Sequence, residues 1–204
     1  MSKIYIVRHG ETVWNVEDRF QGWENSNLTK KGRQQAKAIG KFLKEVKIEQ
    51  IYCSPLKRCK DTFKIIKSAI PNLQTINIIE DDRLKECSYG NVEGLIQKQV
   101  VTHLLLKGID RRDPEIKFNF KFLQGESYKD QLVRLLNFVD TTNLQFTKDN
   151  TLIVCHMGTM KYLSIILQNK LDMKDIYEVT MWRPSNNILV IFDTENNSLD
   201  LVEL

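Results

Sequence analysis

The chain has 204 residues, of which 42% are hydrophobic and 27% charged, and this balance is typical of a globular protein with one well-buried core, not of a disordered or fibrous chain. No apolar run approaches the roughly 20 residues that a membrane-spanning helix needs, and the N-terminus lacks the pattern of an export signal, so we expect a cytoplasmic protein. A formal net charge of +4 is mild, and it fits an anionic small molecule at least as well as nucleic acid.

Segments with the pattern of strands and segments with the pattern of helices alternate along the chain, which predicts an α/β fold. The expected elements in chain order are strand 3–7, helix 28–46, strand 50–53, a helix from 54 to 71, strand 74–79, strand 151–155, helix 158–167, and strands 187–192 and 198–202, which form a C-terminal hairpin or adjacent edge strands. We therefore expect a three-layer sandwich in which helices cover both faces of a mostly parallel sheet.

Residues at the ends of the expected helices support these boundaries. Thr29 is a candidate N-cap for the first helix. Ser54 followed by Pro55 suits the N-cap and the first helical position of the second helix, and Pro71 should end it.

The stretch at about 95–125 is the hardest to assign, because it mixes a helical pattern with irregular sequence. A long irregular insertion of this kind often covers a functional site. We expect a single domain over 1–204 with a cap or insertion in this stretch.

The cysteines form neither a CxxC pair nor a zinc-ribbon spacing. Reduced structural thiols in a reducing compartment are therefore expected. The four positions are Cys53, Cys59, Cys87 and Cys155.

Two of the expected apolar strands are followed directly by histidine. His9 follows the strand at 3–7 closely, and His156 follows the strand at 151–155. Because ligands of parallel α/β sheets collect at the carboxyl ends of strands, both imidazoles should face one crevice. The simpler alternative for each is a core or turn histidine held by a backbone hydrogen bond.

Cations occur close to these strand ends. Arg8 directly precedes His9, and Gly10 permits a tight turn that presents its amide toward a ligand. Arg58 should lie in the first turn of a helix, where free amides and the helix dipole already favour phosphate. A guanidinium can bind two phosphate oxygens at once, although Arg58 alone could also be a surface residue.

A proton donor is available in the segment 83–95, which contains Glu86 and Glu93. Glu86 precedes a turn of small residues, as a side chain aimed into a cleft would. Glu93 stands before Gly94 at an expected helix start, where the dipole stabilises a carboxylate without any catalytic role.

The motifs "VRHGET", "RFQGW", "SPLKRCKDT", "RLKECSYGNVEG", "GES" and "LIVCHMGTMKYL" resemble, in order and spacing, those of the histidine phosphatase superfamily in its phosphoglycerate-mutase-like branch. The resemblance covers nearly the whole chain and is weaker between 96 and 150. It implies that His9 is a nucleophile that becomes phosphorylated and that Glu86 is the proton donor. The implied phosphate pocket consists of Arg8, Arg58 and a protonated His156, with no metal and no other cofactor.

The same resemblance implies further residues around the phosphate. Asn15 and the backbone near Gln21 and Gly22 would line the pocket. Met157 stands where many members have glycine, and methionine is suitable there if it contributes only a backbone amide.

Two enzymatic functions fit these residues: a phosphomonoesterase of the histidine acid phosphatase type, acting on small phosphorylated metabolites, and a phosphoglycerate mutase. Cys87 stands where the mutases have a substrate-binding arginine and Gly158 where they have asparagine, which favours the phosphatase. Arg111 and Arg112 resemble an arginine pair of the mutases and favour the mutase.

Two weaker alternatives are an inactive binding module of the same fold and a metal site built from His9, Glu86 and His156. The complete set of polar residues argues against the inactive module. A phosphorylated small molecule is therefore the expected partner, nucleic acid and membrane are not, and a homodimer is left open.

Overall fold

A computed structural model describes residues 2–110, 119–172, 179 and 182–204, so that Arg111 and Arg112 lie outside the described residues. In the described part of the chain, six strands form one sheet in the order β3-β2-β4-β1-β5-β6. These strands are β1 (Lys3–Arg8), β2 (Gln50–Cys53), β3 (Ile78–Glu80), β4 (Thr151–Cys155), β5 (Ile188–Asp193) and β6 (Ser198–Glu203). The first four pair in parallel, whereas β5 and β6 pair antiparallel, so the mostly parallel sheet is confirmed.

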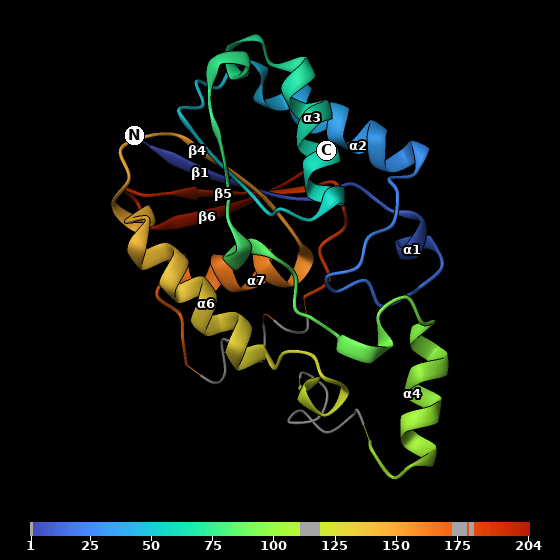
Figure 1. The fold of residues 1–204 in the computed structure, drawn as a ribbon. Coiled ribbons are helices and arrows are strands. Elements are labelled where there is room, and N and C mark those ends of the chain that lie inside the picture. The colour runs from blue at the N-terminus through green and yellow to red at the C-terminus, as the bar shows by residue number, and fades with distance from the viewer. Residues whose placement is uncertain (1, 111–118, 173–178, 180–181) are drawn as a thin grey trace.

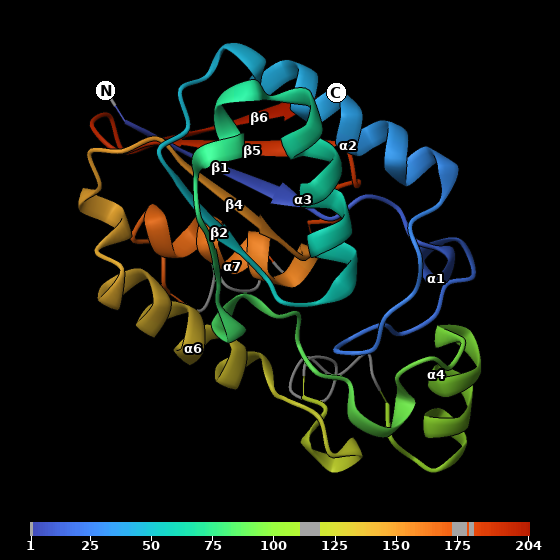
Figure 2. The same ribbon diagram turned by 45° about the horizontal axis from the view of Figure 1, so that its top comes forward.

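The helices lie on both faces of this sheet, as Figures 1 and 2 show. They are α1 (Val13–Val16), α2 (Lys30–Phe42), α3 (Lys57–Ala69), α4 (Gln97–Leu106), α6 (Tyr128–Thr141) and α7 (Met157–Leu167). Helices α2 and α3 pack on one face and α6 and α7 on the other, each pair with its own cluster of buried side chains. The three-layer α/β sandwich predicted from the sequence is therefore confirmed.

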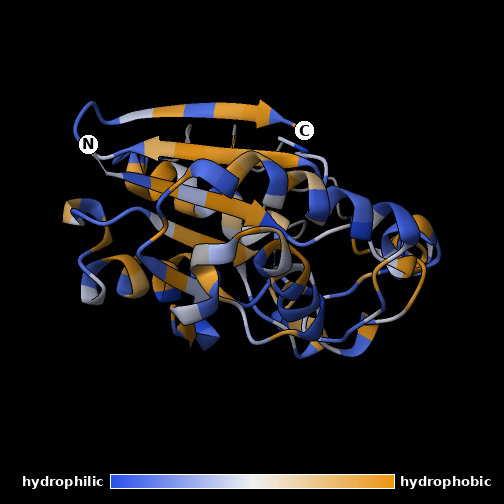
Figure 3. Cartoon of the chain, turned by 90° about the horizontal axis from the view of Figure 1, so that it is seen from above, coloured by the Kyte–Doolittle hydropathy of each residue, from blue (hydrophilic) through white to orange (hydrophobic). Residues whose placement is uncertain are grey.

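The central strands are apolar because both of their faces are covered. In β1, Ile4 and Ile6 pack into the cluster under α6 and α7, whereas Tyr5 and Val7 pack into the cluster under α2 and α3. Every residue of β4 is buried. Hydrophobic residues are accordingly concentrated in the strands in Figure 3. The tightly packed core around β1 and β4 therefore fixes the positions of the residues that directly follow these strands.

Two helix boundaries differ from the sequence prediction. Thr29 is the N-cap of α2, as expected, with its hydroxyl accepting a hydrogen bond from the Gly32 amide at 2.9 Å. The helix ends at Phe42, and a short 3₁₀ turn follows in place of the last expected turn. Ser54 does not cap the next helix, because α3 begins at Lys57 and has no side-chain cap.

The third strand is shorter and later than predicted. Residues 71–75 form a 3₁₀ helix, and β3 covers only Ile78–Glu80. Its register with β2 pairs Ile51 with Ile78 and Cys53 with Glu80, so a short neighbour limits its length. The buried Leu73 instead anchors the preceding turn in the core under α2 and α3. The C-terminal hairpin forms as expected.

Helix α4 lies beside the main sandwich, within the stretch expected to be a cap (Figures 1 and 2). It contributes Val100 and Leu104 to a third, small cluster of buried side chains that also contains Phe20 and Phe120. Part of the expected cap, residues 111–118, lies outside the described residues, and the single-domain assignment stays a prediction. Among the helices that the structure describes, none is both long and apolar enough to cross a membrane.

Candidate active site

The carboxyl ends of β1 and β4 bring the two predicted histidines together. The strands are neighbours with Arg8 in register with Cys155, and the His9 amide donates to the Cys155 carbonyl at 2.9 Å. The imidazoles of His9 and His156 are 5.3 Å apart between ring centroids and inclined by 60°. Both side chains are buried, with 3% and 0% exposure. The strand ends therefore bring both imidazoles together, as predicted, and His9 also lines the cavity described below.

The ring of His9 is fixed in a tautomer suited to nucleophilic attack. Its Nδ1 lies 2.9 Å from the Gly10 carbonyl oxygen. Because a carbonyl oxygen only accepts hydrogen bonds, Nδ1 carries the proton and Nε2 keeps its lone pair. The Asn186 side chain holds the same turn from behind by donating to the His9 carbonyl at 2.8 Å.

Gly10 has a different role from the one expected. Its amide donates to the Thr62 hydroxyl at 3.0 Å instead of facing a ligand. A Cβ atom at this position would meet the Gly32 carbonyl oxygen at 2.4 Å. Glycine is therefore required because α2 approaches the turn so closely.

Both histidines are held in the neutral form by their surroundings. Burial lowers the pKa of His9 well below its ordinary value, and the neighbouring charges of Arg58 and Arg8 lower it further. Burial, Arg58 and His9 likewise lower the pKa of His156. These groups by themselves oppose the protonation of His156 that we expect with phosphate bound, and that protonation stays a prediction. A phosphate dianion beside it would oppose this shift.

These pKa shifts predict that the folded state loses stability in acid. Below pH 6.5 the unfolded chain binds a proton at each of these histidines and the folded chain does not. The free energy of unfolding should then fall with falling pH, by up to about 1.4 kcal/mol per pH unit for each histidine. Urea unfolding between pH 7.5 and 5.5 measures it.

A variant separates His9 from the other titrating groups. His9→Asn should reduce the pH slope of the free energy of unfolding. An identical slope in wild type and His9→Asn would contradict the assignment of a neutral, buried His9.

Two arginines line this crevice, and backbone carbonyls hold both of them in place. Arg8 donates from Nη1 to the Pro184 carbonyl at 2.8 Å, and Arg58, only 1% exposed, donates to the carbonyls of Gly22 and Glu24 at 2.7 Å each. The Nε atoms of both arginines are buried and have no hydrogen-bond partner in the described part of the chain. Burial lowers the pKa of Arg8 to about 10, and lowers that of Arg58 as well. Two such cations make a strong anion site.

A cavity of about 720 Å³ opens in front of these groups. The predicted site residues that line it are Arg8, His9, Asn15, Gln21, Gly22, Arg58, Glu86 and Met157. His156 is not among its described lining residues, although its ring contacts that of His9. Met157 begins α7 and does not have positive φ, so methionine is compatible with this position. The side-chain oxygen of Asn15 accepts a hydrogen bond from the Thr12 amide, so its NH₂ group can donate to a ligand.

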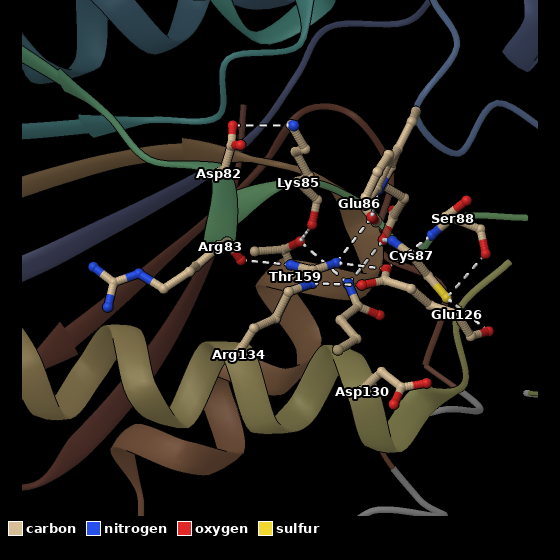
Figure 4. Close-up of polar contacts among 12 residues, drawn as sticks. Asp82, Arg83, Lys85, Glu86, Cys87, Ser88, Glu126, Asp130, Arg134 and Thr159 are labelled. Carbon is tan, nitrogen blue, oxygen red and sulfur yellow. Dashed lines mark hydrogen bonds and ion pairs between the residues drawn. The ribbon is translucent and has the colours of Figure 1, made fainter.

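Glu86 lies on the cavity wall and is held at several points (Figure 4). One carboxylate oxygen accepts from the Cys87 amide at 3.0 Å and from Gln131 at 3.2 Å, and the other accepts from the Gly158 amide at 3.0 Å. Its backbone carbonyl accepts from Arg134 at 2.9 Å. The carboxyl group is therefore fixed in position, as proton transfer requires.

Gly158 is in close contact with this carboxylate. A Cβ atom there would meet Oε1 of Glu86 at 2.4 Å. The asparagine that the mutases carry at this position would collide with Glu86 in its present place. Gly158 and Glu86 therefore form a matched pair.

Sequence reasoning missed two residues that contact His156. The Ser54 hydroxyl lies 2.7 Å from its Nε2, and the Cys59 thiol lies 3.4 Å from the same atom. Ser54 directly follows β2, so the strand-end argument that found the histidines could also have found it. Its pairing with Pro55 suggested a helix cap instead. Cys59 carried no signal, because a buried cysteine is common in any core.

The weaker sequence hypotheses can be compared with this geometry. Among the described residues, no group of three or more His, Cys, Asp and Glu side chains is arranged to hold a metal ion. All four cysteines are free and buried in the structure, and their reduced state stays a prediction. Glu93 does not start a helix, since α4 begins at Gln97, and it is absent from the described cavity wall.

A histidine whose Nε2 keeps its lone pair, close to two arginines at the carboxyl edge of an α/β sheet, defines a class of phosphoryl-transfer protein. The chain belongs to the histidine phosphatase superfamily (branch 1), whose family model matches residues 4–204. The resemblance stated from the motifs is thereby confirmed.

Relatives with both kinds of activity are similar to this chain. The 2,3-bisphosphoglycerate-dependent phosphoglycerate mutase 2 of Gloeobacter violaceus is 30% identical over 83% of this chain and 77% of its own length. The phosphoserine phosphatase 1 of Hydrogenobacter thermophilus is 29% identical over 79% of this chain and 74% of its own length. The solved structure of YhfR from Bacillus stearothermophilus superimposes with a TM-score of 0.80 at 28% identity, covering 100% of this chain and 96% of that one.

Proposed function

We propose that this chain is a phosphomonoesterase that acts through a phosphohistidine at His9. The observation that carries the proposal is the His9 ring, whose Nδ1 proton is bound by the Gly10 carbonyl while Nε2 keeps its lone pair beside Arg8 and Arg58. Such a nitrogen can displace an alcohol from a phosphoryl group when the phosphate charge is neutralised and the reacting atoms are aligned.

The reaction has two steps on these residues. In the first, Nε2 of His9 forms a bond to phosphorus, the bond from phosphorus to the ester oxygen breaks, and Glu86 gives its proton to the departing alkoxide. In the second, Glu86 takes a proton from water, whose oxygen attacks phosphorus and releases His9. Arg8 and Arg58 stabilise the charge on the phosphoryl oxygens in both steps.

The phosphatase is favoured over the mutase by what surrounds Glu86. A mutase must hold its sugar acid while the phosphate changes position, and this requires fixed contacts to the carboxylate. Cys87 and Gly158 cannot supply them, and Gly158 has no room for a larger side chain. The resulting weak hold on the alcohol favours its release and the entry of water.

The size and walls of the cavity indicate the kind of alcohol that it accepts. A volume of about 720 Å³ is within the range of sites for drug-sized ligands. Its wall includes aromatic side chains from several elements, among them Trp14, Phe20, Tyr89, Phe120 and Tyr128. We place small phosphorylated metabolites with an apolar part among its substrates.

Two further features belong to the proposal. Because burial and two arginines lower the pKa of His9, the nucleophile stays unprotonated below pH 6.5, which suits activity of the acid phosphatase type. The four free thiols suit a cytoplasmic protein.

The proposal is tested by supplying 3-phosphoglycerate with and without 2,3-bisphosphoglycerate, while 2-phosphoglycerate and free phosphate are followed together. A panel of phosphomonoesters is assayed in parallel. We expect phosphate release from several monoesters, unaffected by the bisphosphate. Efficient isomerisation with little release of phosphate would make the chain a mutase instead.

A further inference from the structure

Glu93 is the hydrogen-bond acceptor for a turn that carries the phosphate-site arginine. Its Oε1 accepts from the amides of Trp23 at 3.1 Å and Tyr89 at 2.8 Å, and its Oε2 accepts from the amide of Glu24 at 3.1 Å. The Ser88 hydroxyl adds a fourth bond at 3.2 Å. One half-buried carboxylate thus joins the turn at 22–24 to the segment at 88–89.

The same turn binds Arg58 from its opposite side. The Gly22 carbonyl accepts from Nη2 of Arg58 at 2.7 Å, and the Glu24 carbonyl accepts from Nη1 at 2.7 Å. The Gly22 carbonyl and the Trp23 amide belong to one trans peptide group, which points them in opposite directions. A single peptide group therefore lies between the Glu93 carboxylate and the Arg58 guanidinium.

This arrangement fixes the orientation of the Arg58 guanidinium at the cavity wall. Both of its terminal nitrogens are bound to the turn, and its buried Nε has no partner in the described part of the chain. A charged acceptor at one end of a peptide group also polarises the carbonyl at the other end, which strengthens its bond to the guanidinium.

The turn is built around the Glu93 side chain. Gly22 has φ of +51°, and a Cβ atom there would meet Oε1 of Glu93 at 2.0 Å. The Trp23 indole, carried by the same turn, donates to the Glu86 carbonyl at 2.9 Å. The turn therefore contacts both the arginine that would bind phosphate and the residue that would donate the proton.

We infer that Glu93 is a positioning residue, which aims Arg58 at the phosphoryl group through the turn at 22–24. The inference rests on the proposed function. Glu93 touches no substrate, because it is absent from the described cavity wall and its carboxylate oxygens are bound to the turn and to residues 88–89.

The test uses Glu93→Gln, which keeps the shape of the side chain but removes the charge and turns one acceptor into a donor. We expect the dissociation constant of inorganic phosphate, measured by calorimetry, to rise roughly tenfold or more, and kcat/KM for p-nitrophenyl phosphate to fall by a similar factor. The matched control is Glu80→Gln, which loses only a surface ion pair with Lys60 and should behave as wild type.

The double variant separates positioning from general loosening of the fold. If Glu93 acts through Arg58, then Glu93→Gln should change kcat/KM by less than about twofold in an Arg58→Ala background. Should Glu93→Gln fail to fold, Glu93→Asp, which keeps the charge on a shorter side chain, takes its place with the same expectation.

The possible failures are distinguishable. If Glu93→Gln binds phosphate as tightly as the wild type does, the inference alone is overturned. The same holds if Glu93→Gln lowers kcat/KM by an equal factor in the wild-type and Arg58→Ala backgrounds. A wild-type protein that neither binds phosphate nor hydrolyses monoesters would overturn the proposed function together with the inference.

Discussion

Replacing His9 by asparagine is expected to lower the turnover of p-nitrophenyl phosphate by roughly 10⁴-fold or more, because the variant has no nitrogen able to form the covalent intermediate. The asparagine NH₂ group can still donate to the Gly10 carbonyl, which His9 Nδ1 now binds at 2.9 Å, so the turn should survive. Steady-state kinetics and an unfolding curve measure both effects.

His103→Asn provides the control for this experiment, because His103 is exposed on α4 and should be dispensable. If His9→Asn retained a large part of the wild-type activity while His156→Asn abolished it, the nucleophile would have to be reassigned to His156.

Glu86→Gln is expected to separate substrates by their leaving group. A general acid contributes roughly 10²–10⁴ in rate, so alkyl phosphates, whose alkoxides need a proton, should lose activity by about this factor. The loss with p-nitrophenyl phosphate should be much smaller, because p-nitrophenolate leaves readily without a proton. Measurement of kcat for both kinds of ester gives the ratio directly.

The comparison with Glu93→Gln makes the Glu86 experiment specific. A residue that acts through the phosphate-binding arginine should affect both kinds of ester alike, because both carry the same phosphoryl group. Equal losses for Glu86→Gln would therefore show that Glu86 binds substrate and does not donate the proton.

The sequence predicted the framework of the site because that framework depends on local patterns. Apolar strands at 3–7 and 151–155 could be recognised from composition alone, and the histidines that follow them had to meet if the strands were parallel neighbours. The N-cap Thr29 was equally local. The catalytic roles of these residues came from the order of the sequence motifs, because a hydrophobic pattern predicts secondary structure but not chemistry.

The parts that the sequence did not reveal depend on contacts between distant segments. The bond between Ser54 and His156 joins residues 102 positions apart, and Ser54 carried a stronger local signal for a helix cap. The length of β3 is limited by its pairing with β2, which the apolar run at 74–79 does not encode. The role of Glu93 required the fold, because its partners lie on the turn at 22–24.

The protonation state of His156 could not be read from the sequence for a related reason. A histidine near a phosphate site is readily assigned a positive charge, but burial and the charge of Arg58 act on the same ring and lower its pKa. Only the fold shows that these effects coincide.

The central claim is that the phosphoryl group passes through His9, and trapping the intermediate tests it most directly. The enzyme is mixed with a ³²P-labelled monoester, quenched within milliseconds at alkaline pH, and digested for mass spectrometry. We predict an acid-labile phosphate on the peptide that contains His9, formed at a rate no slower than turnover and absent from His9→Asn. A phosphate found on His156 with none on His9, or steady hydrolysis without any labelled protein, would contradict the account.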